Sequence, residues 1–463
     1  MVDIATLDGA RTTLSASEIA ALRNGLRGAL VLADDPDYER ARHVWNGNVD
    51  RRPALIARCR DAADVQRAVS FASAHGLLVS VRGGGHSAPG YGTNDDGMVI
   101  HLSPMKAIAV DPTERTARAE GGVLWRELDE ATQAHGLATT GGVVSNTGIA
   151  GLTLGGGLGW LMGKHGASVD NLIAVDVVTA DGVLRRASAT EHPDLFWGLR
   201  GGGGNFGVVT ALEYRLHPVA EVLGGVVLHK LDDAVDMLRF YRDFCSKLPD
   251  EAEAHAALLT SPEGVPMAGM LLGYNGPIEE GERILAPARR FGHPAADLVA
   301  PMPYAARNSM LDAPGAEHGL HRYWRSAFTE RLSDDLIDVM VDGAARFSSP
   351  LSSLFLFYLH GAISRMPVDA TAFGARQVQW DFDAIGQWTD RSESASHIAW
   401  VRDLWARLEP HLQGTVYINH VADDDRPEKV RASFGDNLQR LREIKAVYDK
   451  ANLFRVNSNI PPA

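Results

Sequence analysis

The segment from Val79 to Tyr91, Val-Ser-Val-Arg-Gly-Gly-Gly-His-Ser-Ala-Pro-Gly-Tyr, places a histidine directly after three consecutive glycines. Glycines leave the backbone N–H groups uncovered by side chains, so the main chain can wrap closely around an anion such as a diphosphate. His86 would present its imidazole to whatever that turn holds. The pairing predicts a cofactor-binding turn with a reactive histidine at its edge.

A later glycine cluster, between Gly202 and Gly207, matches the G-x-G-x-x-G pattern of dinucleotide-binding Rossmann turns. That pattern needs a strand before it and a helix directly after it, so that the helix N-terminus meets the pyrophosphate. Here a short helix is predicted before the glycines, at 194–199, and a strand after them, at 207–216. The first cluster fails the same test, because the Pro-Gly-Tyr-Gly that follows it cannot open a helix. The Rossmann interpretation is therefore disfavoured.

The elements that must position these residues change in character along the chain. Up to about 217, short strands and helices surround three glycine clusters, at 83–92, 141–159 and 201–207. Beyond Pro218 the clusters stop, and strands combine with longer helices. The predicted strands are 77–82, 116–120, 171–179, 207–216, 254–260, 267–274 and 353–360, and the predicted helices are 61–75, one around Leu124 and Leu128, 278–291, 395–409 and 426–449. We place the domain change near 217 and expect the tail to fold back onto the first domain.

The composition excludes several classes of protein. With 463 residues, 45% hydrophobic and 22% charged, the chain is of ordinary globular type and long enough for two domains. A net charge of −13 argues against nucleic acid or an anionic membrane surface as a partner. Neither a membrane span nor a signal peptide is predicted. The two cysteines, Cys59 and Cys245, are too few for a disulfide framework and favour the cytoplasm.

No metal site is predicted. His318 and His321 are spaced i,i+3, but they lack supporting cysteine or carboxylate residues, and such pairs are more often surface residues.

Several ordered motifs carry a family resemblance. The turn at 82–90 is followed by Gly-Ile-Ala-Gly-Leu-Thr-Leu-Gly-Gly-Gly-Leu-Gly at 148–159, by Asn-Phe-Gly-Val-Val-Thr at 205–210, and by the closing Asn-Leu-Phe-Arg-Val-Asn-Ser-Asn-Ile-Pro at 452–461. From about Trp45 to the last residues the chain resembles the FAD-linked oxidases related to vanillyl-alcohol oxidase and berberine bridge enzyme. The resemblance implies an α+β, two-domain fold of the PCMH type. Residues 1–216 and 415–463 would bind FAD, and an antiparallel sheet in 217–414 would cover the flavin.

The resemblance also implies the cofactor contacts. His86 would be bonded covalently to the 8α-methyl carbon of the flavin, which retains the cofactor and makes the ring a stronger hydride acceptor. Many relatives add a cysteine bond to C6, but Val144 stands at that position, so no 6-S-cysteinyl link can form. The compact Thr147 falls at the position that controls oxygen access. The remaining implied contacts are Arg82, Gly83, Gly84, Gly85, Ser87, Gly142, Val143, Ser145, Gly148, Gly151, Leu152, Gly155, Gly157, Gly159, Gly207, Val209, Asn457 and Asn459.

The substrate side is less well defined. Hydride loss from an alcohol needs a base for the hydroxyl proton, and relatives often use a tyrosine in a Tyr-x-Asn-Tyr strand. The corresponding segment here ends in His420, whose unperturbed pKa near ~6.5 suits proton abstraction at neutral pH, although a structural role is equally open. Tyr417, Tyr358 and His360 are lesser candidates. An amine substrate could donate hydride as its free base without help from the protein.

The predicted function is oxidation of a small alcohol or amine, with reoxidation by molecular oxygen giving hydrogen peroxide. Two alternatives remain: a dehydrogenase that uses another electron acceptor, and a catalytically inert flavin-binding protein. The expected partners are a small-molecule substrate and oxygen, and the protein is expected to be a monomer or homodimer. The sequence of 217–414 does not identify the substrate.

Overall fold

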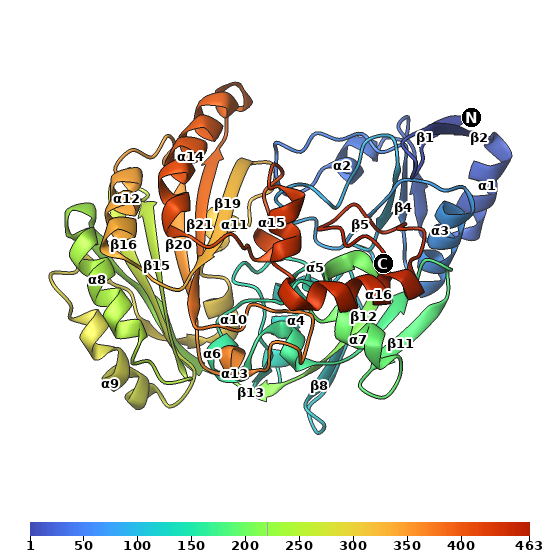
Figure 1. The fold of residues 1–463 in the computed structure, drawn as a ribbon. Coiled ribbons are helices and arrows are strands. Elements are labelled where there is room, and N and C mark those ends of the chain that lie inside the picture. Colours follow the sequence, from blue (N-terminus) through green and yellow to red (C-terminus); the bar gives the residue numbers. More distant parts are fainter. Residues whose placement is uncertain (220) are drawn as a thin grey trace.

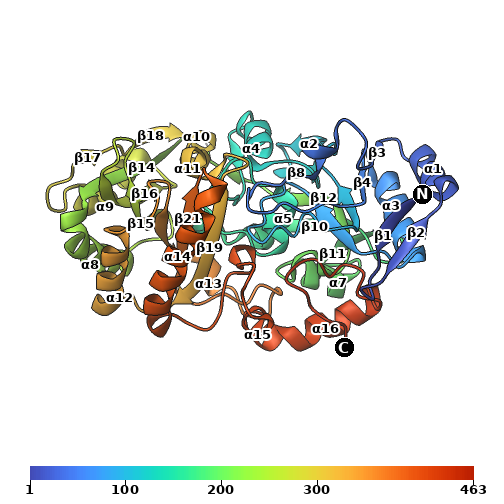
Figure 2. The same cartoon turned by 90° about the horizontal axis from the view of Figure 1, so that it is seen from above.

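The computed structural model describes residues 1–219 and 221–463, which form two lobes lying side by side (Figures 1 and 2). The chain up to β13 forms one lobe, and the strands from Glu221 to Trp388 form the other. The C-terminal helices return to the first lobe. The α+β class and the antiparallel sheet of the second lobe agree with the sequence predictions.

The first lobe contains two main sheets. One has the order β3-β4-β6-β5, and β4 and β5 run parallel to β6. The other is antiparallel, with the order β11-β10-β12-β8-β7. The strands of this lobe are β1 (Val2–Ala5), β2 (Arg11–Leu14), β3 (Ala29–Val31), β4 (Leu55–Arg58), β5 (Val79–Arg82), β6 (Met98–His101), β7 (Ile108–Asp111), β8 (Thr116–Glu120), β9 (Leu137–Ala138), β10 (Leu172–Val178), β11 (Leu184–Ser188), β12 (Val208–Arg215) and β13 (His217–Pro218). Strand β5 leads directly into the first glycine cluster.

The helices of the first lobe are α1 (Ala16–Gly25), α2 (Tyr38–Arg42), α3 (Ala62–Ala74), α4 (Trp125–Gln133), α5 (Ile149–Leu154), α6 (Met162–His165) and α7 (Pro193–Leu199). Helix α7 precedes the third glycine cluster and strand β12 follows it, which is the reverse of the Rossmann order.

The second lobe is built on an eight-stranded sheet of order β17-β14-β16-β15-β20-β21-β19, with β18 paired to β14. Its strands are β14 (Glu221–Lys230), β15 (Ala252–Thr260), β16 (Pro266–Tyr274), β17 (Ala296–Asp297), β18 (Ala300–Pro303), β19 (His321–Thr329), β20 (Ser353–Leu359) and β21 (Gln379–Trp388). Its helices are α8 (Ala234–Cys245), α9 (Ile278–Arg289), α10 (Tyr304–Asn308), α11 (Asp312–Gly315), α12 (Asp334–Ala344), α13 (Ala362–Arg365) and α14 (Ser394–Leu408).

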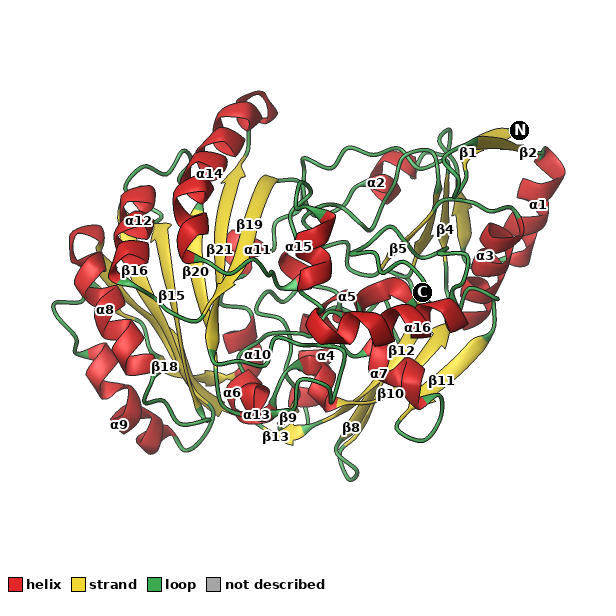
Figure 3. Cartoon of the chain, in the orientation of Figure 1, coloured by secondary structure: helices red, strands yellow, loops and turns green. Residues whose placement is uncertain are grey.

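Helices α8, α9, α12 and α14 cover the outer face of this sheet, as Figure 3 shows. The inner face looks toward the first lobe, and Phe355 and Phe357 of β20 share an apolar cluster there with Leu158 and Trp160. Side chains alternate between the two faces along a strand, so one residue in two on β19, β20 and β21 points to the space between the lobes.

The C-terminal segment differs from its prediction in two places. The single helix expected over 426–449 is wrong: α15 (Pro427–Ala432) and α16 (Leu438–Tyr448) are separated by a turn in which Gly435 has φ of +51°. The segment around Asn419 is a single 3-10 turn rather than the family's strand. Phe434 and Leu441 pack into the core of the first lobe, beside β8 and β12. The described residues contain no helix both long and apolar enough to span a bilayer.

Candidate active site

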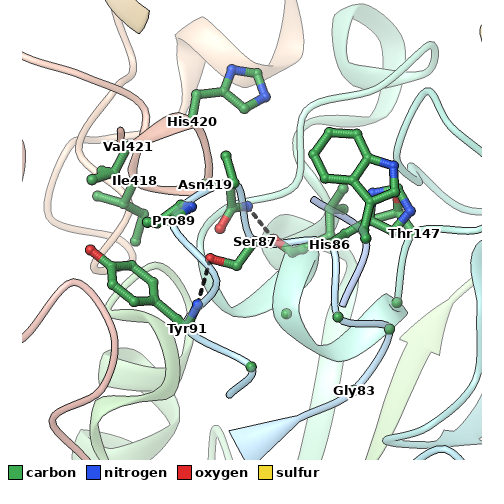
Figure 4. A pocket seen from close by; sticks show the side chains of 18 of the residues that line it. Gly83, His86, Ser87, Pro89, Tyr91, Thr147, Ile418, Asn419, His420 and Val421 are labelled. Carbon is green, nitrogen blue, oxygen red and sulfur yellow. Dashed lines mark hydrogen bonds between the residues drawn. The ribbon is translucent and has the colours of Figure 1, made fainter. Parts of the chain in front are cut away.

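A cavity between the lobes collects residues from several separated parts of the chain. Its floor is formed by the glycine turn after β5, by the second glycine segment, and by the third glycine cluster together with Asn457. Its roof is formed by residues of β19, β20 and β21. Figure 4 shows Ser87, Pro89 and Tyr91 of the glycine turn close to Ile418 and Asn419, with His86 and His420 lining the same pocket.

The glycine turn presents unused backbone donors to this cavity. Within the described chain, no backbone carbonyl accepts a hydrogen bond from the N–H groups of residues 83–87. Gly85 has φ of +73°, which favours glycine, and a Cβ on Gly84 would lie 2.4 Å from the backbone nitrogen of Gly148. Two glycine segments therefore pack backbone against backbone, and the exposed N–H groups suit a diphosphate.

Arg82 lines the cavity, but its guanidinium group does not face it. Nε donates to the carbonyl of Gly92 at 2.9 Å and Nη1 to that of Ala41 at 2.6 Å. The buried side chain thus holds the neighbouring loops together, and the backbone of the turn remains the group available to bind a ligand.

His86 is held in one orientation at the end of the turn. Its Nε2 lies 2.7 Å from Oδ1 of Asn146, and its ring stacks on Trp45 with centroids 4.7 Å apart. Burial lowers the pKa of His86 to about 3, helped by the neighbouring His318 and Arg322. The imidazole is therefore neutral at physiological pH and keeps one nitrogen lone pair.

The second glycine segment splits into two groups. Part of it lines the cavity, as do the later residues Gly207, Val209 and Asn457. The lining members are Val143, Val144, Thr147, Gly148, Ala150, Gly151, Leu152, Leu154 and Leu158. Gly142, Ser145, Gly155, Gly157, Gly159 and Asn459 lie outside the lining. Packing accounts for the glycines among them: a Cβ on Gly159 would lie 1.7 Å from the carbonyl oxygen of Gly141, for example.

Two predicted catalytic candidates lie away from the cavity. On β20, Ser353, Phe355 and Phe357 line it, so Tyr358 points to the opposite face of the sheet. Tyr358 contacts Trp380 there in a tilted arrangement, with ring centroids 5.0 Å apart. His360, just beyond the strand, is buried with its Nε2 3.0 Å from the carbonyl oxygen of Ala252.

His420 lies between two fully buried carboxylates of β21. Its Nδ1 is 2.9 Å from Oδ2 of Asp381 and 3.1 Å from Oδ1 of Asp383. The two carboxylates raise the pKa of His420 to about 10, against the opposing effect of burial. The expected pKa near 6.5 is therefore wrong, and the ring is an imidazolium at neutral pH. Burial and the charge of Asp383 raise the pKa of Asp381.

Both carboxylates are tied to β19 as well. Asp383 accepts a hydrogen bond from Nε1 of Trp324 at 2.7 Å, and Asp381 accepts one from Ser326 at 3.0 Å. Asp383 lines the cavity, and its Oδ2 has no hydrogen-bond partner among the described residues. The ligand atoms of Asp381, Asp383 and His420 lie close enough together to ligate a metal ion. The imidazolium already balances one of the two negative charges without one.

Tyr417 supports the second glycine segment. Its hydroxyl accepts hydrogen bonds from the backbone N–H of Gly157 at 2.8 Å and from Nδ2 of Asn419 at 2.7 Å. Burial raises the pKa of this phenol well above its ordinary value. The hydroxyl is thus engaged in holding the loop in place.

Sequence reasoning missed Trp45, Asn146, Trp324, Asp381 and Asp383. For the two aspartates a signal was present, because the stretch Gln-Trp-Asp-Phe-Asp-Ala-Ile places two carboxylates at i,i+2 in an otherwise apolar strand. Residues with that spacing share one face of a sheet. Nothing comparable marked Asn146, whose partner is sixty positions earlier.

The bare glycine turn, the neutral histidine and the paired carboxylates line one cavity, which suits a cofactor that carries a diphosphate. Comparison with known proteins agrees. The family "FAD binding domain" matches residues 53–188, and the family "Berberine and berberine like" matches residues 416–461. An FAD-linked oxidoreductase of Bacillus subtilis, YgaK, is 30% identical over 94% of this chain and 97% of its own.

The chain belongs to the FAD-linked oxidoreductases of the berberine-bridge type. (R)-6-hydroxynicotine oxidase of Paenarthrobacter nicotinovorans is 28% identical over 94% of this chain and 97% of its own. The crystal structure of 6-hydroxy-D-nicotine oxidase from Arthrobacter nicotinovorans matches with a TM-score of 0.88, covering 97% of this chain and all of that one at 28% identity. Glucooligosaccharide oxidase of Acremonium strictum, 24% identical with a TM-score of 0.87 and covering 96% of this chain and 99% of its own, shares the fold. The resemblance inferred from the sequence motifs is confirmed.

Proposed function

We propose that the protein is an FAD-dependent oxidase that removes a hydride from a small alcohol or amine and passes the electrons to oxygen, giving hydrogen peroxide. Residues 1–216 and 415–463 would hold FAD, and residues 217–414 would cover it. The observation that carries the proposal is the neutral His86 at the end of a bare glycine turn, facing the same cavity as Asp383.

FAD fits this cavity because each of its parts meets suitable chemistry. The free N–H groups of residues 83–87 would hold the diphosphate, and Val143 and Leu152 would contact the flavin ring. His86 would form the 8α bond to the flavin. When bound there, FAD supplies a two-electron acceptor, which the side chains of this protein cannot provide.

Asp383 is the proton acceptor that the arrangement favours. His420 already carries its proton at neutral pH, whereas Asp383 lines the cavity, and its buried Oδ2 has no hydrogen-bond partner among the described residues. His420 and Trp324 would orient that carboxylate and moderate its charge. In this proposal His420 is a positioning residue for the base, and Tyr417 holds the glycine loop.

The lining of the roof supports a small, mostly apolar substrate. The roof and the adjoining loops contribute Leu158, Leu311, Trp324, Leu351, Phe355, Phe357 and Ile385. Among the described lining residues, the only arginine is Arg82, which is bonded to backbone carbonyls. A carboxylate substrate would therefore find no free arginine, and the only other cation among the described lining residues, His420, is already paired with Asp381 and Asp383. An alcohol or amine would find Asp383.

The position of Thr147 supports oxygen as the acceptor. This compact side chain lines the cavity at the position that governs oxygen access in the family. Val144, which also lines the cavity, offers no thiol for a second covalent link. The cofactor would therefore be attached through His86 alone.

The test is a panel of small alcohols, amines and sugars added anaerobically to the purified protein. Bleaching of the flavin by an alcohol or amine, followed by peroxide release when oxygen is readmitted, would support the oxidase. Bleaching without peroxide would indicate a dehydrogenase, and no bleaching by any compound would indicate an inert flavoprotein. For the covalent link, acid precipitation should leave flavin on the wild-type protein but release it from His86→Ala.

A further inference from the structure

We infer that Asn146 is a positioning residue for cofactor attachment: it fixes the hydrogen of His86 on Nε2 and so leaves Nδ1 free to bond the flavin. The inference rests on the proposed covalent link through His86 and assigns a role to a residue outside the family motifs described above.

The orientation of the Asn146 amide determines the tautomer of His86. Nδ2 of Asn146 lies 2.6 Å from the carbonyl oxygen of Ala316, and a carbonyl can only accept a hydrogen bond. Oδ1 must therefore be the atom that faces Nε2 of His86, at 2.7 Å. Because Oδ1 also accepts, the hydrogen of the neutral imidazole lies on Nε2, and the lone pair lies on Nδ1.

The surroundings of His86 keep this arrangement in place. Trp45 stacks on the imidazole, and its Nε1 donates to the carbonyl of Gly315 at 2.8 Å. The charged or titratable groups facing His86 are His318 and Arg322, and both oppose protonation of the ring. No carboxylate contributes to its titration, so the ring stays neutral and singly protonated.

The residues that hold His86, Asn146 and Trp45, are themselves held by hydrogen bonds to the second lobe. Asn146 and Trp45 both donate hydrogen bonds to the carbonyls of residues 315 and 316, at the end of α11. At the start of the same helix, Asp312 accepts hydrogen bonds from the backbone N–H and the hydroxyl of Ser145. A segment between β18 and β19 thus holds residues of the first lobe in place around His86. Attachment would require both lobes to be docked.

The Nδ1 lone pair of His86 forms the new bond to the 8α carbon. One hydrogen of that methyl group leaves as a proton, and the alkylated imidazole gives up the proton of Nε2. The two electrons of the broken C–H bond stay on the ring until oxygen, the acceptor of the proposed function, takes them up together with two protons as hydrogen peroxide. The step needs Nδ1 without a hydrogen, which is the state that Asn146 imposes.

The experiment measures the rate of covalent attachment in the full-length protein, expressed under riboflavin limitation and then mixed with excess FAD. Intact mass and flavin fluorescence in denaturing gels report the bond independently of turnover. Asn146→Leu removes the acceptor, and we expect attachment to slow roughly tenfold or more, in line with the loss of a buried hydrogen bond. Asn437→Leu is the matched control, because its amide also joins separate segments but lies outside the cavity lining; its rate should stay within about twofold.

Asn146→Asp separates positioning from a general structural role. A carboxylate keeps the acceptor but raises the pKa of His86, and an imidazolium has no lone pair on Nδ1. Attachment should therefore be slow at acidic pH and recover as the pH rises, whereas the wild-type rate should show no such dependence on His86 between about pH 6 and 9. Wild-type rates in Asn146→Leu, or a flat profile in Asn146→Asp, would overturn the inference. Absence of covalent flavin in the wild-type protein would instead overturn the proposed link itself.

Discussion

The glycine segments and the inner face of the large sheet form opposite walls of one cavity, and they do so by different means. On the glycine side the backbone itself forms the wall, and Gly84 and Gly148 lie too close together for either to carry a side chain. On the sheet side the wall consists of side chains, and strand alternation selects Phe357 while excluding Tyr358. The glycine wall therefore depends on the residue type at each position. The sheet wall depends on which residues of each strand point toward the cavity.

The largest effect is expected on the glycine side. In Gly84→Ala the new Cβ would lie 2.4 Å from the backbone of Gly148, which has no flexible side chain to move away. We expect the variant to lose its flavin and about 3 kcal/mol of unfolding free energy, measured by flavin content and chemical denaturation. Gly414→Ala, where a Cβ would meet nothing within 4 Å, is the control. Full flavin content in Gly84→Ala would contradict the backbone-contact argument.

The next effect tests the side-chain wall. Asp383→Asn removes the proposed proton acceptor, and flavin reduction by an alcohol substrate should slow by a factor of about 10² to 10⁴. Stopped-flow absorbance under anaerobic conditions measures this step, and covalent flavin content should not change. The exposed Asp335→Asn serves as the control. If flavin reduction in Asp383→Asn were as fast as in the wild-type protein, Asp383 would not be the proton acceptor.

A third prediction concerns pH and stability. The carboxylates raise the pKa of His420 to about 10, whereas an unfolded histidine titrates near ~6.5. The folded protein thus holds a proton that the unfolded chain releases, so the contribution is complete below about pH 6.5 and is lost as the pH rises through about 10. The melting temperature of the wild-type protein should exceed that of His420→Asn by a margin that shrinks over this window. A margin independent of pH would show that His420 is not charged by this pair.

The smallest effect is expected for two adjacent residues of β20, Phe357 and Tyr358. Phe357→Leu reshapes the roof of the cavity and should change the KM of an apolar substrate by about tenfold. Tyr358→Phe alters the opposite face and should leave both kcat and KM within about twofold of wild type. Steady-state kinetics on a single substrate decides between them. Equal effects of the two changes would contradict the assignment of Phe357 and Tyr358 to opposite faces of the sheet.

Several features of the first lobe could be recognised in the sequence, because their signals are local. The glycine turn, His86 and the strand 116–120 could each be recognised from a few consecutive residues, and the order of helix and strand around Gly202 was enough to disfavour a Rossmann turn. The helix break at Gly435 was missed because the helical pattern continues on both sides of it. A local signal was present there, since Gly-Asp-Asn at 435–437 favours a turn and Gly435 has φ of +51°.

The sequence did not show which residues of the roof face the cavity. Tyr358 and Phe357 are both aromatic and adjacent, so composition does not distinguish the residue facing the cavity from the one facing the helices. His420 was noticed as a possible base, but its pKa depends on Asp381 and Asp383, which lie about forty positions earlier in the sequence and become its neighbours only in the folded sheet.

By itself, the sequence determined the family, the two-lobed α+β organisation and the backbone turn that ends in His86. These features could be read from short runs of consecutive residues, in which the residue types themselves carry the signal. Only the tertiary structure decided which nitrogen of His86 carries the hydrogen, which aromatic residues face the cavity and how His420 is charged. Those properties depend on contacts between distant segments, and the physical reason is that hydrogen-bond direction, strand register and burial exist only once the lobes have packed together.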